Sequence, residues 1–429
     1  MKSNSFFLCV FIFWLFGLHT VTAQKLQKDD EAIQPIKIDL NDDGSQYIRF
    51  IMWQQIWLTT NNLAADQGQL QLSTSIRRSR YIAYAQLTDK FLVLTHFGLN
   101  GLNTNNIIAN STNGKAAQFY LHAAWGEMKL NEYLYIGAGL HYWRGLTRVS
   151  SLSSTKSLTL DQSKPYLAWH SMNITDQSAR HLGLYMKGDV GKLQYRFALN
   201  SPAKANLENG KDYGSSFYHE SEPLSQLTYT GVSVKDKNGL QKGNQILEGY
   251  VKWDFWEKES SKLPSRPGSY LGQKSILSVG AGFFIHPNGM YDNLLKIHRG
   301  VTHFALDAYL DIPTHLGAFH TYIALYDFNY GPAYIGRWAG TGKAVYGEAG
   351  VFLKEAKMMP YVSFSHSDFD GAVDVISSFD LGVNYYLKGQ HAKLTIEYHN
   401  IGKDFREGEL TPGGLEHLTQ LRMQFQIYL

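Results

Sequence analysis

The last nine residues of the chain, LRMQFQIYL at positions 421–429, have the pattern that decides the fold. Apolar side chains at Leu421, Met423, Phe425 and Ile427 alternate there with polar ones, and the chain ends on an apolar leucine. An alternation with a period of two is typical of a β-strand with one apolar and one polar face. Because most chains end in a frayed polar tail, we expect another strand to hold this end in place.

The opposite end of the chain indicates export. It begins with Lys2, continues with an unbroken apolar run over 6–18, and then reaches small residues that suit cleavage. This order predicts a secretory signal peptide over 1–23, since the apolar run is shorter than the roughly 20 residues that a spanning helix needs. Cys9 is the only cysteine in the sequence, so we expect the exported chain to have no disulfide and no thiol chemistry.

The composition narrows the class of protein. The chain has 40 Lys and Arg against 37 Asp and Glu, and this near balance argues against a nucleic-acid binder. It is rich in tyrosine and glycine, with 27 and 39 residues, and no stretch after the signal peptide is apolar enough for a spanning helix. An exported chain made of short, weakly amphipathic segments is typical of a closed transmembrane β-barrel.

After residue 46 the sequence divides into strand-like segments, and the connections between them alternate between long and short, with one exception at 257–272. Short periplasmic turns and longer external loops are typical of bacterial outer-membrane barrels, whereas a soluble sandwich has no reason for this rhythm. We therefore predict an all-β fold, a transmembrane antiparallel barrel of about 16 strands over 47–429, preceded by a periplasmic lead over 24–46. The expected strand windows are 47–60, 78–89, 90–100, 116–130, 132–143, 180–189, 191–200, 245–256, 273–285, 302–310, 316–328, 343–354, 357–366, 378–388, 391–400 and 417–429.

Closure of the barrel would explain the apolar C-terminus. If the last strand pairs with the first one, no unpaired strand edge remains in the membrane. We expect the odd-numbered residues of 421–429 to face lipid and the even-numbered residues to face water.

Five segments together resemble the porins of Bacteroidota outer membranes, of the general or phosphate-selective type. These are DGSQYIRFIMWQQIWLTT at 43–60, RRSRYIAYAQLTDKFLVLTHFGLN at 77–100, GLHYWRG at 139–145, DQSARHLGLYMKGDVGKLQYRFALNSP at 176–202 and LTQLRMQFQIYL at 418–429. The resemblance implies a monomer or homotrimer of barrels that passes small hydrophilic solutes and uses no cofactor.

The third long connection, 144–179, is more apolar than an external loop needs to be. In 16-stranded porins the third external loop folds inward and narrows the channel, so the resemblance implies the same for this connection. The alternative is a surface lid with a short helix. The constriction candidates are Asp161, Trp169, His170, Asp176 and Arg180.

Basic side chains outnumber acidic ones on the strand faces that we expect to line the lumen. Because rings of basic side chains favour anions, we expect a mild anion preference. Arg78 and Arg80 share a face at the external end of the predicted strand 78–89, and guanidinium groups suit carboxylate and phosphate; alternatively, they only solvate the wall or meet lipid head groups. The basic candidates are Arg49, Arg78, Arg80, Lys187, Lys192, Arg196, Lys252, Lys354, Lys388, Lys393 and Arg422, and the acidic ones are Asp189, Glu248, Asp254, Glu348, Asp380 and Glu397.

Several aromatic residues, among them Trp53 and Trp57, lie near predicted strand ends. We expect an aromatic girdle at the membrane interface, with a sugar-stacking track inside the pore as the alternative. The 16 histidines show no metal-ligand spacing.

Two other functions are consistent with a barrel. One is an outer-membrane enzyme of the lipase or protease type, which needs a nucleophile beside a histidine; His141 and Ser150 are the imaginable pair. The other is a surface protein that binds a partner through the long connection 201–244 and uses the barrel as an anchor.

Overall fold

The computed structural model describes residues 36–61, 63, 70–108, 116–143, 145–160, 181–202, 207–208, 227–229, 238, 245–336, 339–371, 375–401 and 418–429. The predicted signal peptide, 1–23, lies outside these residues. No helix among them is long and apolar enough to cross a membrane.

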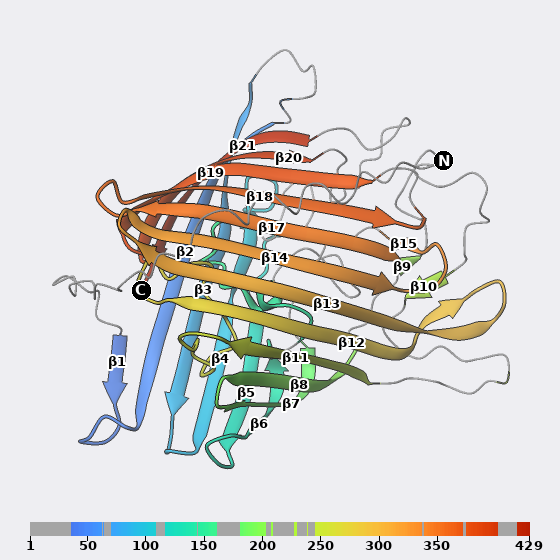
Figure 1. Ribbon diagram of the computed structural model, residues 1–429, viewed down its shortest axis with the longest axis horizontal. Helices are drawn as coiled ribbons and strands as arrows, with labels where there is room; N and C mark the ends of the chain where they lie inside the picture. The colour runs from blue at the N-terminus through green and yellow to red at the C-terminus, as the bar shows by residue number, and fades with distance from the viewer. Residues whose placement is uncertain are drawn as a thin grey trace.

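A closed antiparallel barrel forms the body of the molecule (Figure 1). The main sheet has 19 strands, of which β1, β9 and β10 are short additions and the other 16 form the wall. The wall strands are β2 (Tyr47–Thr60), β3 (Leu72–Gln86), β4 (Phe91–Leu102), β5 (Tyr120–Lys129), β6 (Tyr135–His141), β7 (His181–Val190), β8 (Leu193–Ser201), β11 (Ile246–Asp254), β12 (Ile276–Asp292), β13 (Ile297–Thr314), β14 (Gly317–Asn329), β17 (Gly342–Leu353), β18 (Met358–Phe369), β19 (Ile376–Lys388), β20 (Ala392–Ile401) and β21 (Leu418–Tyr428). The predicted 16-stranded barrel is confirmed.

The seam between β21 and β2 closes the barrel. These strands pair from Trp53 with Tyr428 to Thr59 with Arg422, and the backbones of Met52 and Leu429 continue the ladder with two further hydrogen bonds. The apolar end of the chain is therefore a barrel strand, and its backbone groups are satisfied as a lipid environment requires.

The two faces of the wall differ in polarity as the alternation predicts. Along β21, Leu421, Met423, Phe425 and Ile427 are about 40% exposed on the outer face, whereas Arg422, Gln424 and Gln426 are buried on the inner face. The outer face of the other strands likewise carries exposed Leu, Ile, Val and Phe side chains. The outer surface thus has the composition that lipid requires, and the inner surface is polar.

The lead before the barrel is partly a strand. β1 (Ile36–Asp39) pairs with the periplasmic end of β2, from Ile36 with Phe50 to Asp39 with Tyr47. It runs in the same direction as β21 and continues the wall along β2 below the C-terminus. The predicted periplasmic lead thus includes a short strand at 36–39, where Ile36 and Ile38 alternate with charged residues.

Three strands extend well beyond their expected windows. β3 begins at Leu72, because the polar stretch LSTS pairs with the external end of β2, so Arg78 and Arg80 lie in mid-strand. β12 and β13 extend through the expected loop 286–301, with a register shift between His286 and Met290. The external end of β12 also pairs with β10 (Leu227–Tyr229), which in turn pairs with β9 (Leu207–Glu208), and these contacts support the longer hairpin.

The expected girdle position of two tryptophans is wrong. Trp53 and Trp57 are buried on the inner face, and Trp57 Nε1 donates to Gln424 Oε1 at 2.7 Å. Their odd numbers place them on the same face as Gln55, which the polar alternation of β2 had already assigned to the lumen.

Candidate functional site

Eight of the eleven basic residues predicted to line the lumen lie on the inner face of the wall, where alternation had placed them, and three of these, Lys187, Lys252 and Lys393, are buried lysines. Arg78, Arg80, Arg196 and Arg422 are buried and Arg49 is half-buried. Arg49 donates to Tyr84 Oη at 3.3 Å, and Arg78 donates to Gln55 Oε1 at 3.1 Å. Arg49, Arg78 and Arg80 lie on the paired strands β2 and β3.

Three other basic residues do not line the lumen. Lys192 lies in the periplasmic turn between β7 and β8, Lys354 lies just after β17, and Lys388 is the last residue of β19. All three are exposed. The prediction of lumen positions for them is wrong, because alternation cannot assign a face where a strand ends. The constriction candidates Asp161, Trp169, His170, Asp176 and Arg180 lie outside the described residues, so their role stays a prediction.

Sequence reasoning missed several carboxylates on the inner face. Glu127 on β5 and both Asp307 and Asp311 on β13 are buried there. The alternation could have found them, since Asp307 and Asp311 share the parity opposite Leu306 and Leu310. With these carboxylates included, the described inner wall has no general excess of basic side chains.

The first part of the third connection, residues 145–160, crosses the interior of the barrel; we call it the inner segment. It contains the short helix η1 (Arg148–Ser151). At one end, the backbone N–H of Arg148 donates to Asp307 Oδ2 on β13 at 2.5 Å. At the other, the N–H of Leu160 donates to Glu397 Oε2 on β20 at 2.9 Å. The segment thus runs between two separate parts of the inner wall.

Polar side chains of the inner wall also hold the middle of the inner segment. They donate to four of its backbone carbonyls, from strands on both sides of the seam. The contacts are Gln55 Nε2 to Ser154 O at 2.8 Å, Gln426 Nε2 to Thr155 O at 2.8 Å, Lys393 Nζ to Ser157 O at 2.9 Å and Asn384 Nδ2 to Leu158 O at 3.0 Å. Several polar side chains of the inner wall thus bind the protein backbone instead of facing open water.

A second segment enters the barrel from the periplasmic end. The ladder between β11 and β12 continues until the N–H of Glu257 donates to Ser275 O at 3.1 Å. Residues 258–274, which we call the periplasmic segment, then turn inward between these two points. This long periplasmic connection is the exception, at 257–272, to the alternation of long and short connections in the sequence.

Three wall strands anchor the periplasmic segment. Lys187 Nζ on β7 donates to Ser261 O at 2.9 Å and to Lys262 O at 3.0 Å. Gln194 Nε2 on β8 donates to Glu259 O at 2.6 Å. On β13, Tyr309 Oη donates to Gly268 O at 2.9 Å. The periplasmic segment therefore reaches across the lumen from β7 and β8 to β13.

The two segments pair with each other inside the barrel. The N–H of Arg266 donates to Ser151 O, and the N–H of Ser153 donates to Arg266 O, both at 2.7 Å. The N–H of Gly268 donates to Lys156 O at 2.7 Å. Two chain segments that enter from opposite ends of the barrel are thus joined by a short parallel ladder.

A buried carboxylate, Glu259, joins both segments to the wall. Its oxygens lie 2.6 Å from Arg148 Nη2 on the inner segment, 2.8 Å from Lys252 Nζ on β11 and 3.0 Å from Arg266 Nη1 on the periplasmic segment. Tyr270 Oη donates to it at 3.0 Å. Burial acts to raise the pKa of Glu259, but the three cations, with Arg148 the strongest, hold the pKa well below its usual value. For Arg148, burial acts to lower the pKa, and the Glu259 carboxylate raises it well above its usual value.

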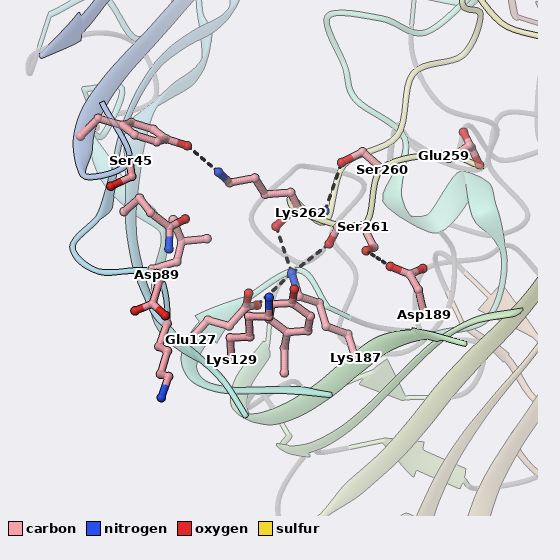
Figure 2. A pocket seen from close by; sticks show the side chains of 15 residues that line it. Ser45, Asp89, Glu127, Lys129, Lys187, Asp189, Glu259, Ser260, Ser261 and Lys262 are labelled. Atoms are coloured by element: carbon pink, nitrogen blue, oxygen red, sulfur yellow. Dashed lines mark hydrogen bonds and ion pairs between the residues drawn. The ribbon is translucent and has the colours of Figure 1, made fainter. Parts of the chain in front are cut away.

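Below the periplasmic segment lies a polar pocket of about 530 Å³ (Figure 2). The ends of β2 to β7 and residues 259–262 line it. Figure 2 shows Lys187 beneath Ser261 and Lys262, to whose carbonyl oxygens its Nζ donates. Glu127 Oε2 lies 3.0 Å from Lys187 Nζ, and Lys90 and Lys129 also line the pocket. This pocket forms a vestibule on the periplasmic side of the two segments.

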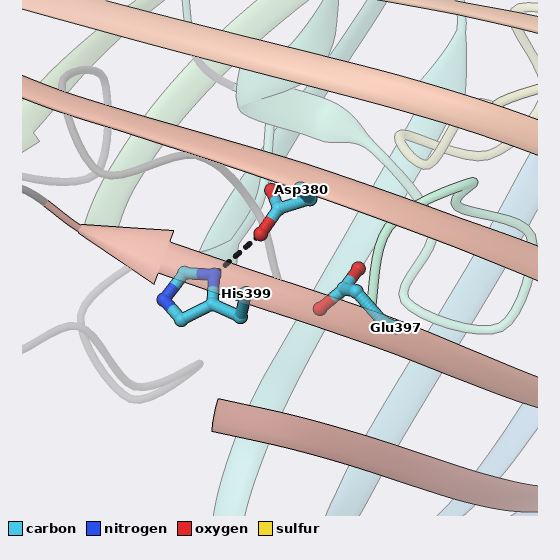
Figure 3. A group of neighbouring side chains, drawn as sticks. All are labelled: Asp380, Glu397 and His399. Atoms are coloured by element: carbon cyan, nitrogen blue, oxygen red, sulfur yellow. Dashed lines mark hydrogen bonds and ion pairs between the residues drawn. The ribbon is translucent and has the colours of Figure 1, made fainter. Parts of the chain in front are cut away.

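Asp380, Glu397 and His399 are the group of side chains on the described inner wall that could offer a metal three ligand atoms, all within 4.8 Å of one another (Figure 3). Their oxygens already accept hydrogen bonds. Ser363 Oγ donates to Asp380 at 2.5 Å, and Tyr361 Oη donates to Glu397 at 2.8 Å beside the Leu160 contact. Glu397 is therefore an anchor for the inner segment, while Asp380 pairs with His399 and Ser363 on the wall.

The structure does not bring the imagined catalytic pair into an arrangement typical of a hydrolase. Ser150 is buried in η1, with its Oγ 3.0 Å from Thr147 Oγ1. His141 Nδ1 accepts from the N–H of Trp143 at 3.1 Å. The connection 201–244 of the surface-binding alternative lies largely outside the described residues.

Comparison with solved structures agrees with the barrel. OmpF of Salmonella typhi, solved in complex with daunomycin, aligns with a TM-score of 0.56 and 10% identity, covering 91% of this chain and 100% of that one. The outer-membrane channel DcaP of Acinetobacter baumannii aligns with a TM-score of 0.52 and 10% identity, covering 91% and 99%. No protein-family model and no curated protein sequence matches this chain. At such low identity the likeness shows the fold, which is that of outer-membrane porins.

Proposed function

We propose that this protein is an outer-membrane channel through which small hydrophilic solutes pass by diffusion. The observation that carries the proposal is the closed 16-stranded wall with an apolar outer face and a polar inner face. A barrel of about this size is too wide for wall side chains alone to fill. In this protein the inner and periplasmic segments narrow the interior, so passage would depend strongly on solute size.

The proposal also includes a mild preference for anions, which is supported by the charges on one side of the lumen. The sequences of four neighbouring strands, β21, β2, β3 and β4, contain five arginines and no Asp or Glu. The inner-wall carboxylates lie on other strands, such as Glu127 on β5 and Asp307 on β13. A solute that passes along β2 and β3 would move beside the half-buried Arg49 and in the electric field of the buried Arg78 and Arg80, and basic pore linings favour anions.

The proposal is tested by inserting the purified protein into a planar bilayer. We expect discrete single-channel steps, and a reversal potential on the anion side under a salt gradient. Changing Arg78 and Arg80 together to Gln should move the reversal potential toward zero. The control is Lys192→Gln, which removes a basic residue from the exposed turn and should leave the selectivity unchanged. A folded protein that never conducts would contradict the channel, and an unchanged selectivity in the double variant would contradict the arginine pathway.

A further inference from the structure

We infer that the periplasmic segment, residues 258–274, is a second constriction element that sets the size limit of the pathway and is held in place by Glu259. This inference rests on the proposed channel function and adds the chain segment that would govern it.

The first reason is that the barrel does not need these residues. The paired backbone of β11 and β12 reaches Glu257 and Ser275, where a turn of about two residues would suffice to connect two antiparallel strands. The other described connections between wall strands at this end have at most five residues; the turn between β7 and β8, for example, consists of Gly191 and Lys192. The extra residues therefore serve something other than chain connection.

The second reason is that several strands of the barrel wall anchor the periplasmic segment. Its carbonyls accept from Lys187 on β7, Gln194 on β8 and Tyr309 on β13, as described above. The N–H of Tyr270 donates to Asp311 Oδ2 at 3.1 Å, which adds a second contact on β13. A segment fixed at both sides of the lumen narrows it, whereas a segment held at one side could swing away.

The third reason is the charge balance around Glu259. Arg148, Lys252 and Arg266 converge on this one carboxylate, and Lys252 has Asp254 at 2.7 Å as a second partner. Arg148 is the cation that joins the inner segment to the periplasmic one, whereas Arg266 pairs with Glu259 within the periplasmic segment. Without the carboxylate, buried cations would face one another unneutralised, which is strongly unfavourable. Glu259 is therefore the positioning residue for both segments.

The vestibule of Figure 2 shows where a solute would meet the segment. Residues 259–262 line the vestibule together with Lys90 and Lys129. A solute that reaches the periplasm by this route has to pass Ser260 and Ser261. The side chain of Ser261 is itself held, since its Oγ donates to Asp189 Oδ2.

The deciding experiment replaces residues 258–274 by Asn-Gly, which joins Glu257 to Ser275 in a tight turn, and compares single-channel conductance and liposome swelling with the full chain. We expect the conductance of the shortened barrel to rise at least about twofold, and sugars that the full chain excludes to enter. Folding is checked by the resistance of the barrel to unfolding in detergent. A folded shortened barrel with unchanged conductance and exclusion would overturn the inference and leave the channel intact. If neither protein conducts, the proposed channel itself fails.

The role of Glu259 is tested separately, by a readout that does not need conduction. Ser269 is buried on the periplasmic segment, so a thiol in the Ser269→Cys variant should react slowly with maleimide. Adding Glu259→Gln should accelerate the reaction at least about tenfold, because the released segment exposes the thiol. The matched control is Glu257→Gln, an exposed residue just before the segment whose Oε1 can still accept from the Ser275 N–H. Equal labelling rates for the Ser269→Cys protein with and without Glu259→Gln would overturn the role of Glu259.

Discussion

At the scale of single residues, the ionised state of Glu259 decides how the interior responds to acid. Its pKa lies well below the ordinary value of 4.5. A carboxylate with a lowered pKa contributes stability above its unfolded-state pKa, and this contribution is lost only as the pH falls through the folded-state pKa. We therefore expect Glu259 to hold the two segments together between about pH 7 and pH 5, so that no opening step appears in the conductance over this range. The measurement is single-channel recording over this range, and an opening step near pH 5 would contradict the assignment of charges around Glu259.

Gly139 gives a second prediction at this scale. Its φ is +130°, and an added Cβ would lie 2.2 Å from Ala124 O on the neighbouring strand. We expect Gly139→Ala to destabilise the barrel by about 1–3 kcal/mol, because both the backbone conformation and the strand spacing would have to change. Gly126→Ala is the control, since nothing lies within 4 Å of its added Cβ. Urea unfolding in lipid vesicles measures the difference, and equal stabilities would contradict the prediction.

At the scale of elements, β21 tests the sidedness of the wall. Met423 is exposed on the outer face at the middle of the strand. Met423→Lys should destabilise the barrel by about 2–4 kcal/mol, because a cation at the bilayer midplane is costly, whereas the cost falls to about 0–1 kcal/mol near the interface. Ile427→Lys, close to the periplasmic end of the same face, is the control. A similar cost for both variants, measured by unfolding in vesicles, would argue against a midplane position for Met423.

The elements also show what the sequence could and could not predict. Alternation was sufficient for the number of wall strands and for the faces of Arg78 and Arg80, because in β21 and β3 each step of one residue changes the environment between lipid and lumen. Aromatic character was a poorer guide than parity for Trp53 and Trp57, because their odd numbers place them on the inner face with Gln55. Glu259 could not be found this way. Its segment has no regular alternation, and its partner Arg148 is 111 positions away in the chain, so that only the fold brings these two residues together.

At the scale of the whole molecule, the external end and the periplasmic end of the barrel each have an exposed residue that a thiol label could reach after substitution by cysteine. Leu294 lies at the external tip of the β12–β13 hairpin and is 68% exposed, whereas Glu355 lies in the exposed periplasmic turn between β17 and β18. With Cys9 expected to leave with the signal peptide, a single introduced cysteine would be the only thiol. On intact cells, a maleimide too large for the pore should label Leu294→Cys and not Glu355→Cys. Labelling of Glu355→Cys only after the outer membrane is opened completes the test, and the reverse pattern would contradict the orientation.

The seam between β2 and β21 has a consequence for how the protein is made. Gln55 and Gln426, which share a hydrogen bond across it, are 371 positions apart in the chain. Contacts between such distant residues form late, because the entropy of closing so long a loop has to be overcome first. β2 cannot pair with β21 until synthesis and export are finished. Until then the unpaired backbone edge of β2 can pair with any other strand that reaches it first. Assembly is therefore the stage at which this chain is most prone to aggregate, and dilution and a holding chaperone should improve its yield more than any added wall stability.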